Sequence, residues 1–320
     1  MALYGVMKGM LYLLLVIIGI PGNLTVLAAF SMLAMIGNKL LLTEVVICSI
    51  ALVSMVLSLT RGLPVTMYVL FELKDIYTDI GCKFIVYLAR VSRGLAIGQT
   101  CVLVCIQCIF VAPNNTFLSS LKHNLAGYVI KGCALVLLSN IMLEISSLTY
   151  TVSKLNSTFQ EYTFNFGYCI IVVPDYVSYL AVPFSFLIRD LILVILMSIS
   201  SGYILLILFK HKKQVSRIKR KKGEQKMATE MRAAKVVVTL VTLYIFFFGF
   251  ENTIFLYQII ASTHIHPIIS DVRHFFSVCY ASVFPAVIIL SNSRIKSVLK
   301  CYLISKKRIL VNALQHNTVQ

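Results

Sequence analysis

Residues 82–107 read CKFIVYLARVSRGLAIGQTCVLVCIQ, and this stretch decides the fold of the chain. An α-helix rises about 1.5 Å per residue, so about 20 apolar residues cross the roughly 30 Å hydrocarbon core of a bilayer. The stretch is long enough to do so, yet it contains Arg90 and Arg93. A guanidinium is costly in hydrocarbon, so both side chains must face a protein interior or a wet cavity with partners. The stretch therefore predicts a membrane-spanning helix beside a polar binding site.

The composition places the whole chain in a membrane. Of its 320 residues, 59% are hydrophobic and only 13% are charged, against roughly a quarter charged in ordinary soluble domains. A soluble domain this apolar would have too little polar surface to stay in solution. The formal net charge of +17 does not indicate nucleic acid, because the basic residues lie in the connections between apolar runs. Membrane topology produces that distribution.

Seven apolar runs follow one another along the sequence. Each is too long for a buried strand, and a closed barrel needs shorter, alternating segments. We therefore predict an all-α membrane protein, a bundle of seven transmembrane helices. The runs cover residues 7–35, 41–70, 81–112, 125–150, 180–209, 233–260 and 269–291.

The basic residues are divided unequally between the two sides of the predicted membrane. Twenty Lys and Arg residues fall on one side and five on the other. By the positive-inside rule the richer side is cytoplasmic, which places the N-terminus outside the cell and the C-terminus inside. We expect a multi-pass protein of the plasma membrane. The five outer residues are Lys8, Lys74, Lys83, Lys154 and Arg273.

Two of the nine cysteines fall at outer positions. Cys82 opens the third span and Cys169 lies in the outer connection 148–179, whereas most other cysteines lie in apolar runs and behave as small hydrophobic residues. We predict a Cys82–Cys169 disulfide that holds this connection over the mouth of the bundle. The same connection carries Asn156-Ser157-Thr158, a predicted glycosylation site.

Ionisable residues inside the spans form the candidate site. The helical rise puts Arg90 about 12 Å and Arg93 about 16 Å below Cys82, and the charges of other spans lie at similar depths. We expect them to surround a cavity in the outer half of the bundle. A salt-bridge network that only holds the helices together is the alternative. The intramembrane charges are Arg61, Arg90, Arg93, Glu144, Arg189, Asp190 and Glu251.

Arginine side chains suit carboxylate and sulfate groups, so the expected ligand is a small anionic or zwitterionic molecule. The predicted ligand contacts are Arg90, Arg93, Glu144, Arg189, Asp190 and Glu251, with the aromatic side chains of Tyr87 and Tyr257.

Several other chemistries lack their residues. A retinal protein needs a lysine in the last span, and 269–291 contains none. His264, His266 and His274 lie near the outer face, but isolated loop histidines are usually solvated, so we predict no metal and no cofactor. No HExxH, GxSxG or P-loop pattern indicates an enzyme, and no ring of like charges indicates a channel. The sequence shows no internal repeat of the kind found in many secondary transporters, which weakens that alternative.

Three segments resemble the vomeronasal type-1 receptors and their fish olfactory relatives. They are GCKFIVYLARVSRGLAIGQTC in the third span, SFLIRDLILVILMSISSGYILLILFKHKKQV in the fifth, and the Arg61-Gly62-Leu63-Pro64 end of the second. The resemblance extends over about residues 22–296. It implies a G-protein-coupled receptor for odorants or pheromones that activates a heterotrimeric G protein, of the inhibitory type.

Two departures from the wider rhodopsin-like pattern fit the vomeronasal type. The inner end of the third span, from Gln107 to Pro113, lacks an Asp-Arg-Tyr triplet, and no tyrosine follows Pro285 closely. Bitter taste receptors share the Ser291-Asn292-Ser293-Arg294 ending and are one alternative. A non-signalling transporter or accessory protein is another.

The inner side carries the expected G-protein contacts. The connection 210–235 is basic, which also suits simple anchoring on anionic lipid. The residues predicted to face the G protein are Gln107, Pro113, Lys213, Arg217 and Arg232.

A short tail follows the seventh span. Apolar residues in 293–308 recur with a spacing near 3.6, which predicts an amphipathic helix on the inner leaflet. Cys301 on this helix is a candidate for palmitoylation, with a plain buried thiol as the alternative. We divide the chain into a receptor domain, residues 1–300, and a cytoplasmic tail, residues 301–320.

Overall fold

The computed structural model describes residues 2–73, 77–113, 120–154, 163–215, 224–260, 267–301 and 304. Within them, seven helices are long and apolar enough to cross a membrane, which confirms the predicted bundle. The predicted spans end within one residue of these helices and begin within four.

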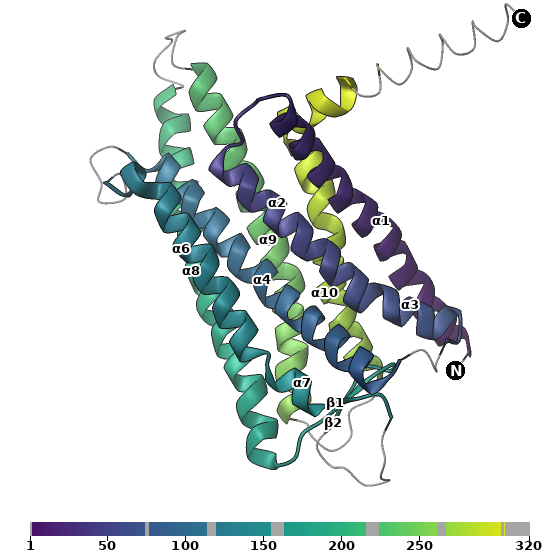
Figure 1. Cartoon of the computed structure of the whole chain (residues 1–320). Helices are drawn as coiled ribbons and strands as arrows, with labels where there is room; N and C mark the ends of the chain where they lie inside the picture. Colours follow the sequence, from purple (N-terminus) through teal and green to yellow (C-terminus); the bar gives the residue numbers. More distant parts are fainter. Residues whose placement is uncertain are drawn as a thin grey trace, which may run out of the picture.

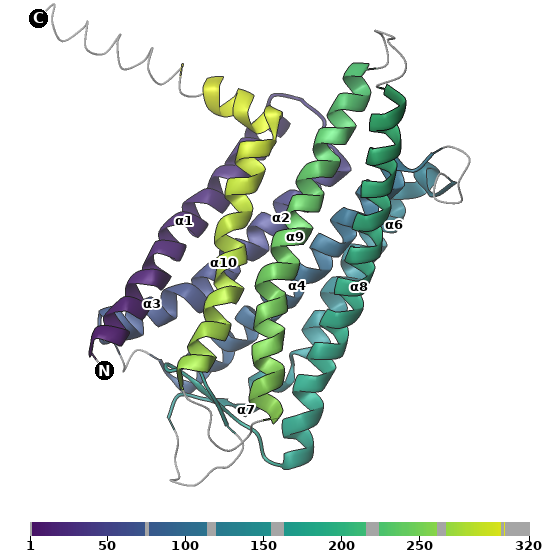
Figure 2. The same ribbon diagram turned by 180° about the vertical axis from the view of Figure 1, so that it is seen from behind.

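The helices run back and forth along one bundle axis (Figures 1 and 2). In chain order the elements are α1 (Ala2–Met35), α2 (Leu42–Leu57), η1 (Ser58–Gly62), α3 (Leu63–Leu70), α4 (Asp79–Val111), η2 (Leu121–Asn124), α6 (Leu125–Leu143), α7 (Ser146–Tyr150), β1 (Thr151–Val152), β2 (Thr163–Asn165), β3 (Ile170–Val172), α8 (Tyr176–Val215), α9 (Glu224–Ile260) and α10 (Pro267–Ser291).

The two ends of the bundle differ. One end carries the strands β1, β2 and β3 and the start of α1, at the bottom of Figure 1, and we call it the sheet end. The other end carries the end of α8, the start of α9 and the helical residues 293–301 after α10, and we call it the tail end.

Helix α4 is the centre of the bundle and packs on α2, α6, α8 and α9. Its close approach to α6 depends on Gly94 and Gly98. A Cβ added at Gly94 would overlap the side chain of Asn140, and one at Gly98 would overlap Val136. Small residues four apart allow two membrane helices to approach closely. The glycines therefore bring α6 and its polar residues against α4.

The second span changes its winding where it meets the site. A single π-helical turn, η1, separates α2 from α3, and Pro64 follows it directly. Proline has no N–H, so carbonyls one turn earlier lose a donor, and the hydroxyl of Tyr168 donates to the carbonyl of Thr60 at 3.5 Å. Such π-helical turns are frequent at functional sites. This one places Arg61 inside the bundle, where it is buried.

A small antiparallel sheet in the order β1-β3-β2 covers the sheet end. The Cys82–Cys169 disulfide joins this connection to the first turn of α4, as predicted, with the Cα atoms 5.7 Å apart. The phenol of Tyr168 is buried beside it, and burial raises the pKa of Tyr168 to about 12. The phenol therefore stays neutral where it is buried against the bundle.

The tail end holds the predicted amphipathic helix. Residues 293–301 are helical, and Ile295 is fully buried while Val298 and Leu299 pack against the core. The side chain of Cys301 is exposed.

Several predictions concern residues that lie outside the described part of the chain. They are the glycosylation site Asn156, the G-protein contact Arg217 and all of the tail except 301 and 304. Lys213 lies in α8 and Arg232 in α9, but the structure describes only the backbone of these two residues.

Candidate functional site

Arg93 joins three helices near the middle of the bundle. From α4, its Nε lies 2.8 Å from Glu251 Oε1 of α9, and its Nη1 lies 2.9 Å from Asp190 Oδ2 of α8. Its Nη2 donates to Asn252 Oδ1 at 2.7 Å. All three guanidinium nitrogens therefore have partners in the chain itself.

Glu144, at the end of α6, connects two further arginines to this cluster. Arg189 Nη1 lies 3.5 Å from Glu144 Oε1, and Arg90 Nη1 lies 3.7 Å from Glu144 Oε2. Arg189 also bonds Asn140 Oδ1 at 2.8 Å and pairs with Asp190 at 3.0 Å. The contact between Arg189 and Asn140 exists because Gly94 lets α6 approach, and the charges form one continuous network.

Arg61 enters the network from the second span. Its Nη1 donates to Ser277 Oγ of α10 at 2.7 Å and lies 3.5 Å from Glu251 Oε1. Glu251 thus serves both Arg61 and Arg93.

Arg273 of α10 lies beside the network and makes a different set of contacts. Its Nη1 donates to Gln258 Oε1 at 2.8 Å, and its guanidinium carbon lies 4.3 Å from the ring centre of Phe255. Among the described residues, no carboxylate oxygen is within 4.0 Å of it. The side chain is nevertheless buried, with 6% of the residue exposed.

A small cavity of about 40 Å³ lies among these groups, below the sheet. It is lined by Arg61, Arg90, Arg93, Glu144, Phe166, Phe186, Glu251, Phe255 and Arg273. Phe166 comes from the connection that the disulfide holds, and its ring stacks on buried His274 at 4.6 Å. Ligand pockets usually measure about 300–1,000 Å³, so this cavity is small for a ligand site.

The cluster carries an excess of positive charge. Five arginines, at positions 61, 90, 93, 189 and 273, face three carboxylates, at 144, 190 and 251, which leaves two positive charges uncompensated. The side chains that form ion pairs in this cluster are each at most 14% exposed. An anion in the cavity would therefore reduce the electrostatic cost of the site.

Only four of the eight predicted ligand contacts line the cavity. Arg90, Arg93, Glu144 and Glu251 line the cavity, whereas Arg189 and Asp190 lie behind it and hold the lining residues. The hydroxyl of Tyr87 donates to the carbonyl of Ile141 at 3.4 Å, outside the cavity wall. Tyr257 is 55% exposed and does not line the cavity.

Sequence reasoning missed Arg273, which we assigned to an outer connection. The residue lies four positions inside the predicted seventh span, and that position was the available signal. It also missed the phenylalanine walls, because Phe166, Phe186 and Phe255 resemble ordinary apolar residues.

Of the three histidines near the sheet end, the structure describes His274, which is buried. No group of three His, Cys, Asp or Glu side chains converges in the part of the chain that the structure describes. His264 and His266 lie outside the described residues.

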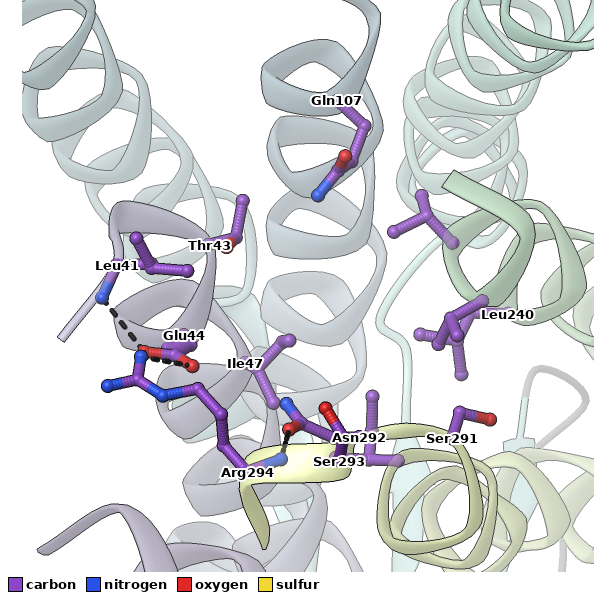
Figure 3. Close-up of a pocket in the computed structure, with 13 residues that line it drawn as sticks. Leu41, Thr43, Glu44, Ile47, Gln107, Leu240, Ser291, Asn292, Ser293 and Arg294 are labelled. Atoms are coloured by element: carbon purple, nitrogen blue, oxygen red, sulfur yellow. Dashed lines mark hydrogen bonds and ion pairs between the residues drawn. The ribbon is translucent and has the colours of Figure 1, made fainter. Parts of the chain in front are cut away.

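A second cavity, of about 150 Å³, lies at the tail end between α2, α4, α9 and α10. Figure 3 shows Gln107 on its wall and the Glu44–Arg294 pair at its edge. Arg294 Nη1 lies 2.7 Å from Glu44 Oε2. Of the predicted G-protein contacts, Gln107 is buried in this cavity wall and Pro113 lies just beyond the end of α4.

The family comparison decides the identity of the bundle. Residues 6–301 match the model of the vomeronasal organ pheromone receptor family. The chain belongs to this family. It is 36% identical over 295 residues to olfactory receptor class A-like protein 1 of Danio rerio, covering 92% of each chain.

Mammalian relatives agree. Vomeronasal type-1 receptor 3 of Homo sapiens is 30% identical over 246 residues, covering 75% of this chain and 77% of the relative. Vomeronasal type-1 receptor 90 of Rattus norvegicus is 26% identical over 304 residues, covering 94% and 96%. The resemblance stated from the sequence is therefore confirmed. The receptor is a multi-pass, G-protein-coupled chemosensory protein and not an enzyme.

Proposed function

We propose that the receptor detects a small anionic or zwitterionic odorant or pheromone in the cavity below the sheet. The observation that carries the proposal is the excess of buried arginine over carboxylate around that cavity. The phenylalanine walls supply apolar contacts for the carbon skeleton of a ligand. Arg90, Arg93 and Glu251 would contact the polar groups of the ligand.

The proposal includes an orientation and a partner. The sheet end faces outside the cell and the tail end faces the cytoplasm, in agreement with the distribution of basic residues. Ligand binding shifts the bundle toward a form in which the tail-end cavity opens to a heterotrimeric G protein, of the inhibitory type that the family implies. The ligand can drive this only by binding one form more tightly than the other.

The remaining assignments belong to the same proposal. Residues 1–300 form the receptor domain and 301–320 its cytoplasmic tail, with palmitoylation at the exposed Cys301 anchoring the junction. The basic 210–235 connection contacts both lipid and the G protein.

The test is a cell-based screen. Cells that carry the receptor and a promiscuous G protein are exposed to acidic, aminergic and steroidal odorants, and the calcium response is recorded. We expect concentration-dependent responses to acids. Uptake of a compound without G-protein activation would contradict the proposal and favour a transporter.

Arg93→Ala tests the cavity in the same cells. We expect the response to be lost because Arg93 lines the cavity and pairs with Glu251 in its wall and with Asp190 behind it. Receptor at the cell surface is measured with an epitope tag, and the response is compared at equal surface amounts. An unchanged potency would show that the ligand binds elsewhere.

A further inference from the structure

Arg273 lacks the counter-charge that the other arginines of the cluster have. Arg61, Arg90, Arg93 and Arg189 each lie within 4.0 Å of a carboxylate oxygen. Among the described residues Arg273 has none, and its Nε has no hydrogen-bond partner although the atom is buried. A buried charge without a counter-charge is expensive. Its presence therefore calls for an explanation.

The nearest acidic residue in sequence does not supply the missing charge. Asp271 pairs with Lys8 at 2.5 Å and accepts a hydrogen bond from the hydroxyl of Tyr4 at 2.8 Å. Residues two apart on a helix point to nearly opposite faces at about 100° per residue. Asp271 thus joins α10 to α1, while Arg273 lines the cavity.

The surroundings of Arg273 hold the guanidinium ready for an anion. Gln258 accepts from Nη1 at 2.8 Å, and the ring of Phe255 lies against the guanidinium face. These contacts fix the position of the side chain without neutralising it. A guanidinium with free N–H groups binds a carboxylate or sulfate through paired, charge-assisted hydrogen bonds.

We infer that Arg273 binds the anionic group of the ligand. The other four arginines are held by the carboxylates of the receptor and shape the cavity, where Arg90 and Arg93 contact the other polar groups of the ligand. This inference rests on the proposed function, since it names the docking residue for the ligand of that cavity. Gln258 and Phe255 act as positioning residues for the guanidinium.

The test uses ligand binding rather than signalling. Purified wild-type receptor is titrated with acetate, benzoate and octanoate, and with the primary amide of each acid, while its melting temperature is followed. A ligand that binds only the folded form raises the melting temperature according to its Kd. We expect at least one acid to bind more tightly than its amide.

Substitution of Arg273 should remove that preference. Arg273→Gln should weaken acid binding by about 10- to 100-fold, as expected for loss of a hydrogen bond to a charged group, and leave amide binding unchanged. Arg273→Lys should keep part of the preference, because it keeps the charge but loses the planar fork. Lys83→Gln is the control, since it removes a positive charge near the start of α4, outside the cavity.

Stability measurements separate ligand binding from a structural role. Without ligand, Arg273→Gln should melt no lower than the wild type, because it removes an uncompensated buried charge. A marked drop in melting temperature would overturn the inference. So would an equal loss of acid and amide binding, or no preference for any acid in the wild type.

Two further results complete the design. Glu161→Gln should bind acids as the wild type does. Glu161 lies outside the described residues, so a large change would assign the counter-charge of Arg273 to the chain and overturn the inference. Acid binding that depends on Arg273 without G-protein activation would overturn the proposed function alone.

Discussion

Gly94 illustrates how a single residue positions the charges of this receptor. An added Cβ there would overlap Asn140 Oδ1 and lie 2.9 Å from Arg189 Nη1. Asn140 is the amide that holds Arg189, and Arg189 in turn pairs with Glu144 and Asp190. The absence of a side chain at Gly94 therefore allows the charge network to form.

We predict that Gly94→Ala destabilises the receptor by about 1–3 kcal/mol, the usual cost of an extra methyl group in a packed interior. Gly202→Ala in α8 is the matched control, because nothing lies within 4 Å of the added Cβ. Alanine there should be neutral or stabilising by about 0.5–1 kcal/mol, since glycine weakens a helix. Melting of the purified receptor checks both, and equal effects would refute the packing argument.

Individual charged residues were predictable to different degrees. Arg90 and Arg93 stand in the middle of a long apolar run, so hydrocarbon cost alone requires partners for them, and Glu144, Asp190 and Glu251 are the partners found. Arg273 stands near the end of a run, where a basic residue equally suits the membrane surface. Only the packing of α10 against α9 shows that it faces inward.

The long helices were predictable from the sequence, and the short elements were not. A span needs only length and apolarity, so the seven runs predicted where each helix ends within one residue and where it begins within four. The strands have two or three residues each and carry no periodic signal. They form because the disulfide and the aromatic residues below hold the connection against the bundle. The π-helical turn η1 likewise depends on Pro64 and tertiary contacts.

The helix of residues 293–301, which follows α10, is linked to α2 by the Glu44–Arg294 ion pair. Glu44 is buried, receives Arg294 at 2.7 and 2.9 Å, and accepts a hydrogen bond from the N–H of Leu41 at the start of α2. The side chain of Arg294 is 34% exposed. Loss of the partner would therefore leave Glu44 as a buried charge, whereas Arg294 could still be hydrated.

We predict that Arg294→Gln costs about 2–3 kcal/mol, because it leaves a buried carboxylate without its counter-charge. Glu44→Gln should cost about 1 kcal/mol, since the freed guanidinium can reach water and the new amide still accepts the Leu41 N–H. The double variant should be less destabilised than the sum of the two. Lys300→Gln, exposed on the same helix, is the control, and the opposite order of costs would contradict this account.

At the scale of the whole molecule, charge and architecture support one orientation. The basic end of α8, the start of α9 and the helix after α10 lie at the tail end, and the disulfide-bonded sheet lies at the sheet end (Figures 1 and 2). Disulfides persist in oxidising surroundings, and basic loops remain on the cytoplasmic side. Both rules support the orientation that we propose, with the sheet end outside the cell.

We predict that an N-terminal epitope tag is stained on intact cells and a C-terminal tag only after permeabilisation. The physical reason is the attraction of the basic tail end to the anionic inner leaflet, about 1 kcal/mol for each Lys or Arg near the surface. Asn156 provides a second readout, because it lies between β1 and β2 in sequence and only a luminal asparagine is glycosylated. Asn156→Gln should remove a glycosidase-sensitive band shift. Asn114 stands in a second sequon, Asn114-Asn115-Thr116, on the expected cytoplasmic side, so Asn114→Gln should leave the band unchanged. A C-terminal tag stained on intact cells, with Asn114 carrying the glycan, would require the opposite orientation and would place the arginine cavity where no extracellular ligand could enter.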